Sequence, residues 1–208
     1  MNREKLDSFI HWARESGKLG LVCCSSGNLS HRIDDDTMLI SSTGSWLPEL
    51  TADQVSLMAI SLDEIHNAVK PSGEFRLHRE IYRTRGDIDT ILHFQSPSAT
   101  TLACMDIRPD YNVIIEVPVY IGNVAYLPFL QPGSEELAKE AGVMMAEASL
   151  LQMANHGQVV CGKGFRDTIQ KAVFFELACS IILKSNFKAI PVGGDQLALL
   201  RNYSVKNY

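Results

Sequence analysis

Hydrophobic positions recur along the chain at two spacings, and the longer spacing indicates helices. In residues 3–16 the apolar side chains fall three or four positions apart, as on one face of an amphipathic helix. They are Leu6, Phe9, Ile10 and Ala13. Two glycines, Gly17 and Gly20, then end the pattern. The same reasoning predicts further helices over residues 75–85, 97–105, 134–150 and 167–184. Ser134 is the expected N-cap of the helix over 134–150.

Shorter apolar runs between turn-forming residues predict strands. These runs cover residues 21–24, 29–33, 38–41, 55–60, 88–94, 113–119 and 159–161. Asp34-Asp35-Asp36 separates two of them and predicts a hairpin turn, whereas the segment after residue 184 is expected to be irregular. Strands and helices do not alternate in a strict βα repeat. We therefore expect one α/β domain over 1–208, with three αβα layers and a mixed, mostly antiparallel central sheet.

Composition and charge narrow the class of protein. Of the 208 residues, 46% are hydrophobic and 21% are charged, which is typical of a globular protein with a sizeable core. The net charge of −5 argues against nucleic acid as the main partner. We expect no membrane span and a cytoplasmic location, because the chain has neither a long apolar run nor a signal-like N-terminal segment. The five cysteines lack a paired-motif spacing and are expected to be reduced.

Three polar loops combine glycine with hydroxyl or amide side chains. They are Ser25-Ser26-Gly27-Asn28, Ser41-Ser42-Thr43-Gly44-Ser45 and Pro71-Ser72-Gly73. Each lies at the end of a predicted strand or between predicted elements. Such loops can direct several backbone N–H groups and hydroxyls at one phosphate, although each loop alone is also consistent with a plain turn.

Four residues near these loops are candidates for chemistry. Glu74 directly follows the third loop and could transfer protons, although a glutamate in the first turn of a helix is also common. His93 and Gln95 alternate along a strand and therefore face the same side. His156 lies between a predicted helix and a predicted strand, and imidazole nitrogen and glutamine oxygen can both bind a divalent metal. The other histidines are expected at the surface: His11, His31, His66 and His78.

Taken in order, these segments resemble the class II aldolase/adducin family. The resemblance covers most of the chain and rests on SSGNLS, LISSTGSWLPELTADQV, KPSGEFRLHREIYRTRGDIDTILHFQSPSATTLA and LLQMANHGQVVCGKGFRDTIQKAVFFE. A glutamate, then a His-x-His position, then a His-Gly pair is that family's signature of a catalytic divalent metal. This chain has Gln95 where the family normally has the second histidine of the His-x-His pair.

The resemblance implies roles for individual residues. The substrate's phosphate would be held by Gly27, Asn28, Thr43, Gly44 and Ser72. Glu74 falls on the family's acid/base position, and the metal, Zn²⁺ or another divalent ion, would be held by His93, Gln95 and His156. A tyrosine of the family acts on the leaving group, and the candidates here are Tyr120, Tyr203 and Tyr208.

The resemblance also implies a reaction and an assembly. The expected enzyme is a metal-dependent aldolase of the fuculose-phosphate type, which cleaves a small phosphorylated ketose to dihydroxyacetone phosphate and a small aldehyde. We expect a homotetramer, as is common in the family. Two alternatives stay open: a sister epimerase or dehydratase that uses the same site, and a non-catalytic adducin-like module in which Gln95 marks a degenerate metal site.

Overall fold

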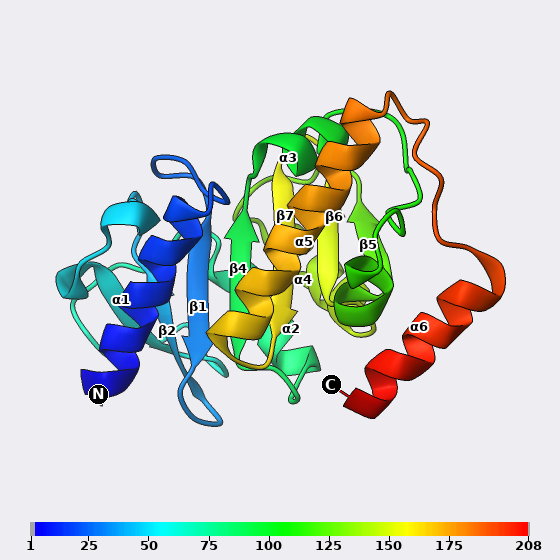
Figure 1. Cartoon of the computed structure of the whole chain (residues 1–208). Helices are drawn as coiled ribbons and strands as arrows, with labels where there is room; N and C mark the ends of the chain where they lie inside the picture. Colours follow the sequence, from blue (N-terminus) through cyan, green and yellow to red (C-terminus); the bar gives the residue numbers. More distant parts are fainter. Residues whose placement is uncertain (1–2, 208) are drawn as a thin grey trace.

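One mixed sheet forms the centre of the molecule (Figure 1). The computed structural model describes the backbone of residues 3–207 and the side chains of residues 3–203. Its strands are β1 (Asn28–Arg32), β2 (Thr37–Ser41), β3 (Val55–Ala59), β4 (Thr90–Phe94), β5 (Val124–Leu127), β6 (Leu150–Met153) and β7 (Gly157–Gly162). Within the described residues they form a 7-stranded sheet in the order β3-β2-β1-β4-β7-β6-β5. Every pair of neighbours is antiparallel except β5 and β6, which confirms the predicted sheet.

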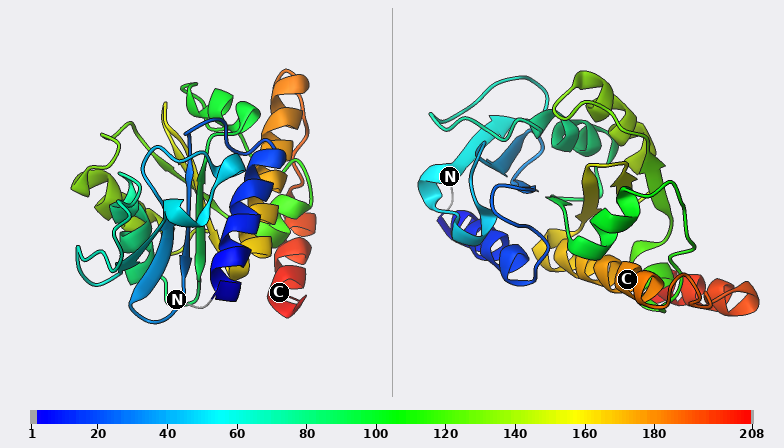
Figure 2. Two further views of the ribbon diagram at one scale, coloured as in Figure 1. Left: turned by 90° about the vertical axis from the view of Figure 1, so that its left-hand side faces the viewer. Right: turned by 90° about the horizontal axis from the view of Figure 1, so that it is seen from above.

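Helices cover both faces of this sheet. They are α1 (Arg3–Lys18), α2 (Phe75–Thr84), α3 (Pro97–Ala103), α4 (Glu135–Met145), α5 (Gly164–Lys184) and α6 (Gly194–Asn207). Figure 2 shows α1 and α5 on one face and α2 and α4 on the other, so the three-layer αβα prediction is confirmed. Helix α6 extends beyond the sheet and contacts a π-helical turn over Val117–Ile121. Among the described helices, none combines the length and apolarity that a membrane crossing requires.

Two hydrophobic clusters fill the spaces between the sheet and its helices. Successive strand residues point to opposite faces, so Ile91 and Leu92 of β4 enter different clusters. Leu92 belongs to the cluster that contains Phe9 of α1, whereas Ile91 belongs to the cluster that contains Ile81 of α2. This alternation places His93, two residues after Ile91, on the same face as α2.

Two predicted strands are absent because local backbone chemistry opposes them. Residues 21–24 form a loop rather than a strand, and Cys24 has a left-handed backbone with φ 53°. Residues 113–119 were predicted as a strand but lead into the π-helical turn. Pro118 in that turn lacks the amide donor that a strand ladder needs.

Three further segments, all in the C-terminal half of the chain, differ from the prediction. The helix predicted over 134–150 ends at Met145, and Leu150 already begins β6. A short, fully buried run such as β6 has no period that separates strand from helix, which explains this error; β5 was also missed, and its four residues are too few to show a period. The segment predicted to be irregular contains α6, whose Leu199 is 68% exposed, so its residues do not follow a buried stripe.

Candidate active site

One carboxylate and two imidazoles meet at the end of the central strands. Glu74 directly precedes α2, His93 is on β4, and His156 lies in the turn between β6 and β7. His93 Nε2 is 3.4 Å from Glu74 Oε2, and His156 Nε2 is 3.1 Å from Glu74 Oε1. One ligand atom from each of the three residues lies within 4.8 Å of the others, a spacing that suits a single bound cation.

A hydrogen bond sets the tautomer of His93. Its Nδ1 is 2.9 Å from the carbonyl oxygen of Gln158, which only accepts hydrogen bonds, so Nδ1 carries the proton. Burial lowers the pKa of His93, so the ring is neutral and Nε2 presents a lone pair toward Glu74. A lone pair that faces a carboxylate is favourable only with a cation or a proton between them. Metal-binding histidines are typically supported in this way, and the donor set therefore fits a divalent metal.

The carboxyl group of Glu74 is held in its ionised form. Burial raises the pKa of Glu74, but attraction to positive charge at the two imidazoles and the hydrogen bonds from His156 and Asn28 outweigh burial and hold that pKa below its ordinary value. Asn28 Nδ2 donates a hydrogen bond to Glu74 Oε2 over 3.0 Å. Glu74 therefore brings a negative charge to the site as well as a group that can accept a proton.

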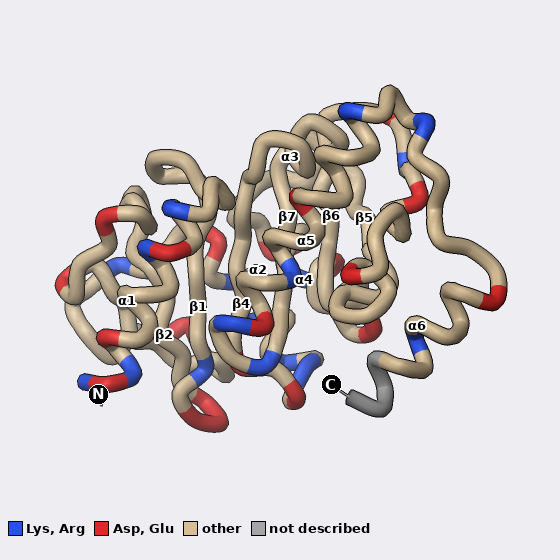
Figure 3. The backbone as a smooth tube through the Cα atoms, in the orientation of Figure 1, with Lys and Arg blue, Asp and Glu red and all other residues tan. Residues whose placement is uncertain are grey.

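The three polar loops line one cavity together with these residues. The cavity has a volume of about 220 Å³, and its lining includes the nine residues predicted to bind phosphate, bind metal or transfer protons: Gly27, Asn28, Thr43, Gly44, Ser72, Glu74, His93, Gln95 and His156. Among the described lining residues there is no Lys or Arg, and the loop that precedes β1 carries no charged residue (Figure 3). An anion in this cavity would be held by hydroxyl and backbone N–H groups.

Strand pairing brings the loops to the imidazoles. β1 pairs with β4 so that Asn28 lies opposite His93. The backbone N–H of Ser72 donates to the carbonyl oxygen of Ser41 over 2.9 Å, which joins the third loop to the second. Gly27 has φ 77°, and a Cβ there would lie 2.6 Å from the backbone oxygen of His93. The first loop can therefore approach β4 this closely only because residue 27 is glycine.

Gln95 lines the cavity beside the imidazoles and is half-buried. Its backbone N–H donates to the carbonyl oxygen of Leu21 over 3.0 Å, which fixes the chain just after β4. Gly157 follows His156 with φ 150°, and a Cβ there would lie 2.7 Å from Gln95 Cγ. The side chain of Gln95 thus packs against the turn that carries His156, and its role as a metal ligand stays a prediction.

The tyrosines considered for the leaving group lie elsewhere. Tyr120 and Tyr203 line a different cavity, together with Phe174 and Leu200. Tyr208 lies outside the described residues. Within the described part of the chain, no tyrosine is among the residues that line the cavity with Glu74.

The prediction that His78 lies at the surface was wrong, because its side chain is fully buried. His78 Nε2 is 2.5 Å from Asn28 Oδ1, and its Nδ1 is 2.7 Å from Ser30 Oγ. The signal that could have found it is the spacing of four residues from Glu74 to His78 and from His78 to Tyr82, which places His78 and Tyr82 on one face of α2 behind Glu74. His31 is also not a surface residue, since its ring is half-buried and stacks on Phe165 at 4.3 Å.

Comparison with known proteins agrees with this geometry. Residues 7–183 match the family described as Class II Aldolase and Adducin N-terminal domain. The chain is 34% identical over 151 residues to a 3-oxo-tetronate 4-phosphate decarboxylase of Pectobacterium atrosepticum. The aligned region covers 71% of this chain and 69% of the relative. It is 30% identical over 176 residues to an L-fuculose phosphate aldolase of Methanocaldococcus jannaschii, covering 84% and 93%. A crystal structure of YgbL from Klebsiella pneumoniae, described as a putative aldolase/epimerase/decarboxylase, superposes with a TM-score of 0.89 at 26% identity, covering 97% and 100%.

Proposed function

The chain belongs to the class II aldolase and adducin family, and from this premise we propose that it is a metal-dependent carbon–carbon lyase that acts on a small phosphorylated 3-oxo sugar acid. The observation that carries the proposal is one cavity in which Glu74, His93 and His156 adjoin three loops of neutral hydrogen-bond donors. The imidazoles and the carboxylate suit a divalent cation, and the loops suit a phosphate.

The metal site would be formed by Glu74, His93 and His156, with Gln95 as a further neutral oxygen ligand. A divalent ion held there, with Zn²⁺ our first choice, supplies an electron-pair acceptor that stabilises negative charge on substrate oxygen atoms. The family resemblance also supports a homotetramer, which sedimentation of the purified protein would test, and a cytoplasmic location, which cell fractionation would test.

The phosphate would be anchored by the loops around Gly27, Thr43, Gly44 and Ser72. Asn28 also lines this region, but its amide already donates to Glu74. Neutral donors can hold a phosphate when several of them converge on it. Anchoring at this end keeps the reacting carbons of a short substrate beside Glu74, which removes the entropic cost of finding the reactive geometry.

The chemistry that favours a decarboxylase is the number of protons to be moved. In 3-oxo-tetronate 4-phosphate, loss of CO₂ breaks the bond between the carboxyl carbon and its neighbour and leaves the electron pair on that neighbour, next to the ketone. Glu74 would take a proton from solvent and pass it to this carbon, which yields dihydroxyacetone phosphate. One proton-transfer residue is sufficient for this reaction, and Glu74 is the carboxylate that lines the cavity.

Retro-aldol cleavage of fuculose 1-phosphate is the second candidate. It releases the same dihydroxyacetone phosphate, but a proton must also leave the hydroxyl whose carbon becomes the aldehyde. Glu74 would have to take this proton before it protonates the carbanion, because no tyrosine is among the described lining residues. The similarity to the L-fuculose phosphate aldolase of M. jannaschii, which covers 93% of that relative, is the observation that favours this candidate.

The shared product allows both candidates to be tested in one assay. Purified protein is analysed for metal before and after chelation, and dihydroxyacetone phosphate is followed with a coupled dehydrogenase. Release together with CO₂ from 3-oxo-tetronate 4-phosphate, lost on chelation and restored by metal, supports the proposal. Release with lactaldehyde from fuculose 1-phosphate supports the second candidate instead.

Two other outcomes would reject both cleavage reactions. Rearranged or dehydrated substrate without dihydroxyacetone phosphate would identify a sister epimerase or dehydratase. Protein that stays metal-free in metal-replete buffer and converts no substrate would identify a non-catalytic module.

A further inference from the structure

A chain of buried hydrogen bonds runs from Glu74 into the core. Asn28 Nδ2 lies 3.0 Å from Glu74 Oε2, and Asn28 Oδ1 lies 2.5 Å from His78 Nε2. His78 Nδ1 is 2.7 Å from Ser30 Oγ, which is 2.9 Å from the hydroxyl of Tyr82. The side chains behind the carboxylate are buried, with His78 and Ser30 fully inaccessible and Asn28 only 5% exposed.

The negative charge of Glu74 fixes the direction of the hydrogen bonds from Asn28 through His78 to Ser30. A carboxylate only accepts, so the NH₂ group of Asn28 faces Glu74 and its carbonyl oxygen faces His78. That oxygen also only accepts, so His78 must carry its proton on Nε2. Burial lowers the pKa of His78 to about 3, so the ring is neutral and its Nδ1 accepts the proton of Ser30. The single hydroxyl proton of Tyr82 lies near two acceptors, Ser30 Oγ at 2.9 Å and the carbonyl oxygen of Asp89 at 3.1 Å.

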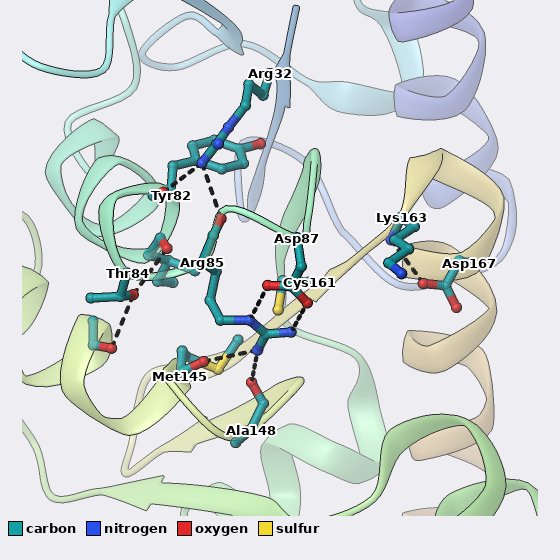
Figure 4. Close-up of polar contacts among 12 residues, drawn as sticks. Arg32, Tyr82, Thr84, Arg85, Asp87, Met145, Ala148, Cys161, Lys163 and Asp167 are labelled. Atoms are coloured by element: carbon teal, nitrogen blue, oxygen red, sulfur yellow. Dashed lines mark hydrogen bonds and ion pairs between the residues drawn. The ribbon is translucent and has the colours of Figure 1, made fainter. Parts of the chain in front are cut away.

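The fold supplies this chain from two rigid elements. His78 and Tyr82 are four residues apart on one face of α2, Glu74 is the N-cap residue four positions before His78, and Asn28 and Ser30 alternate on one face of β1. Figure 4 shows how the C-terminal end of α2 is tied to β1, because the Arg32 guanidinium donates to the carbonyl oxygens of Tyr82 and Arg85. The residues of the hydrogen-bond chain are therefore held in place by the helix on one side and the strand on the other.

We propose that His78 is a positioning residue that locks the amide of Asn28, so that Asn28 orients the Glu74 carboxylate instead of serving mainly as a phosphate donor. A free Asn28 could turn its NH₂ group toward the polar loops. With His78 in place, rotation of the amide would place the Asn28 NH₂ group against the His78 N–H and the Asn28 oxygen against a carboxylate. Both contacts are repulsive, so the amide keeps its orientation. The inference rests on the proposed function only for its kinetic test.

The tautomer of His78 is the first test, and it needs neither substrate nor metal. In ¹⁵N-labelled protein, the imidazole nitrogens report directly which of them carries the proton. We expect His78 to be neutral with the proton on Nε2 at neutral pH, and to remain so in the Tyr82→Phe variant, because the Asn28 oxygen sets this tautomer. A proton on Nδ1 would overturn the proposal, since Asn28 could then not hold its NH₂ group toward Glu74.

Kinetics of His78 variants are the second test, with 3-oxo-tetronate 4-phosphate and fuculose 1-phosphate as substrates. His78→Leu should lower kcat by about tenfold or more while KM stays within about twofold, because a displaced base slows chemistry rather than binding. His78→Gln retains an N–H donor and should recover most of the kcat. His66→Gln is the control and should match the wild type, because His66 is exposed and does not line the cavity.

The two tests separate the possible failures. A raised KM with unchanged kcat in His78→Leu would mean that Asn28 serves the phosphate, and would overturn the proposal. If His78→Leu does not fold, as judged by circular dichroism, the comparison of His78→Gln with wild type and the tautomer measurement decide. Wild-type protein that converts neither substrate would refute the proposed function, while the tautomer would still judge the role of His78.

Discussion

The two sides of the cavity differ in how firmly their polar groups are held. On the side of Glu74 and His93, Asn28 and His93 are buried and hydrogen-bonded to protein atoms, Asn28 to the Glu74 carboxylate and His93 to the carbonyl oxygen of Gln158. On the loop side, Thr43 and Gly44 are exposed, and the donors are neutral. Groups whose positions are fixed before substrate arrives favour proton transfer and metal binding, whereas open loops can adjust to a ligand. We therefore expect substitutions on the two sides to have different consequences.

The largest effect is expected from removing a candidate metal ligand on the buried side. His156→Ala should abolish both bound metal and turnover, because the remaining imidazole and carboxylate leave the cation under-coordinated. Metal content by elemental analysis and product release measure the two losses. His66→Ala, at an exposed position, is the matched control. Full activity without bound metal in His156→Ala would remove the metal from the proposed function.

The next largest effect is expected from Glu74→Gln, which keeps the shape of the side chain but removes its charge and its proton-accepting oxygen. Turnover should fall by about 10²-fold or more even at saturating metal, and the metal should bind less tightly because a neutral amide replaces a carboxylate ligand, while the fold stays intact. Initial rates measured beside metal analysis would check this. Retained turnover would show that Glu74 is not the proton-transfer residue.

A matched pair of glycine substitutions compares the two sides directly. Gly27 has φ 77° and faces the backbone oxygen of His93, whereas Gly44 has φ 73° and no atom within 4 Å of the place that a Cβ would take. Gly44→Ala should cost about 1–2 kcal/mol of unfolding free energy, from backbone strain alone. Gly27→Ala adds a steric conflict and should cost more, about 3 kcal/mol. Urea denaturation would measure both stability losses, and equal losses would contradict the predicted steric conflict at residue 27.

Acid should lower the free energy of unfolding, because His78 on the buried side of the cavity takes up a proton more readily in the unfolded chain. The pKa of His78 is about 3 in the folded protein, below its ordinary value of 6.5, so the unfolded chain binds more protons between these values. The stabilisation is complete above pH 6.5 and is lost as pH falls toward 3, by about 1.4 kcal/mol per pH unit at most. Urea denaturation at several pH values should show a shallower slope for His78→Gln than for His66→Gln. Identical slopes would exclude His78 as the source.

The smallest effect is expected from Gln95→His, which restores the family's usual residue. If the Gln95 oxygen is a ligand, the imidazole should bind Zn²⁺ more tightly, with little change in folding stability. Competition with a chelator of known affinity would measure the change. An unchanged zinc affinity would place Gln95 outside the ligand set.

The sequence predicted those elements whose patterns are local. Helix α1 follows from its apolar spacing, and the β1–β2 hairpin follows from the aspartates between two apolar runs. β6 was missed because its residues are buried on both faces, so Leu150–Met153 carries no alternation. The sheet class was still correct, because it depends on the order of elements more than on their exact ends.

The site could be predicted in part for the same reason. Its nine candidate residues lie in contiguous motifs, and the structure places all of them around one cavity. His78 could not be identified from any motif of its own, since its burial depends on how α2 packs across β1. The tyrosine candidates were chosen by residue type alone, and Tyr120 and Tyr203 line a different cavity.

The pairing of Asn28 with His93 has a consequence for chain length. Because strand side chains alternate, inserting one residue between Asn28 and Ser30 would send one of these two side chains to the opposite face and separate it from α2. The turn at Asp34-Asp35-Asp36 lies at the other end of β1 and could be lengthened without moving that pairing. Tolerance to insertions should therefore differ sharply between the two ends of one short strand.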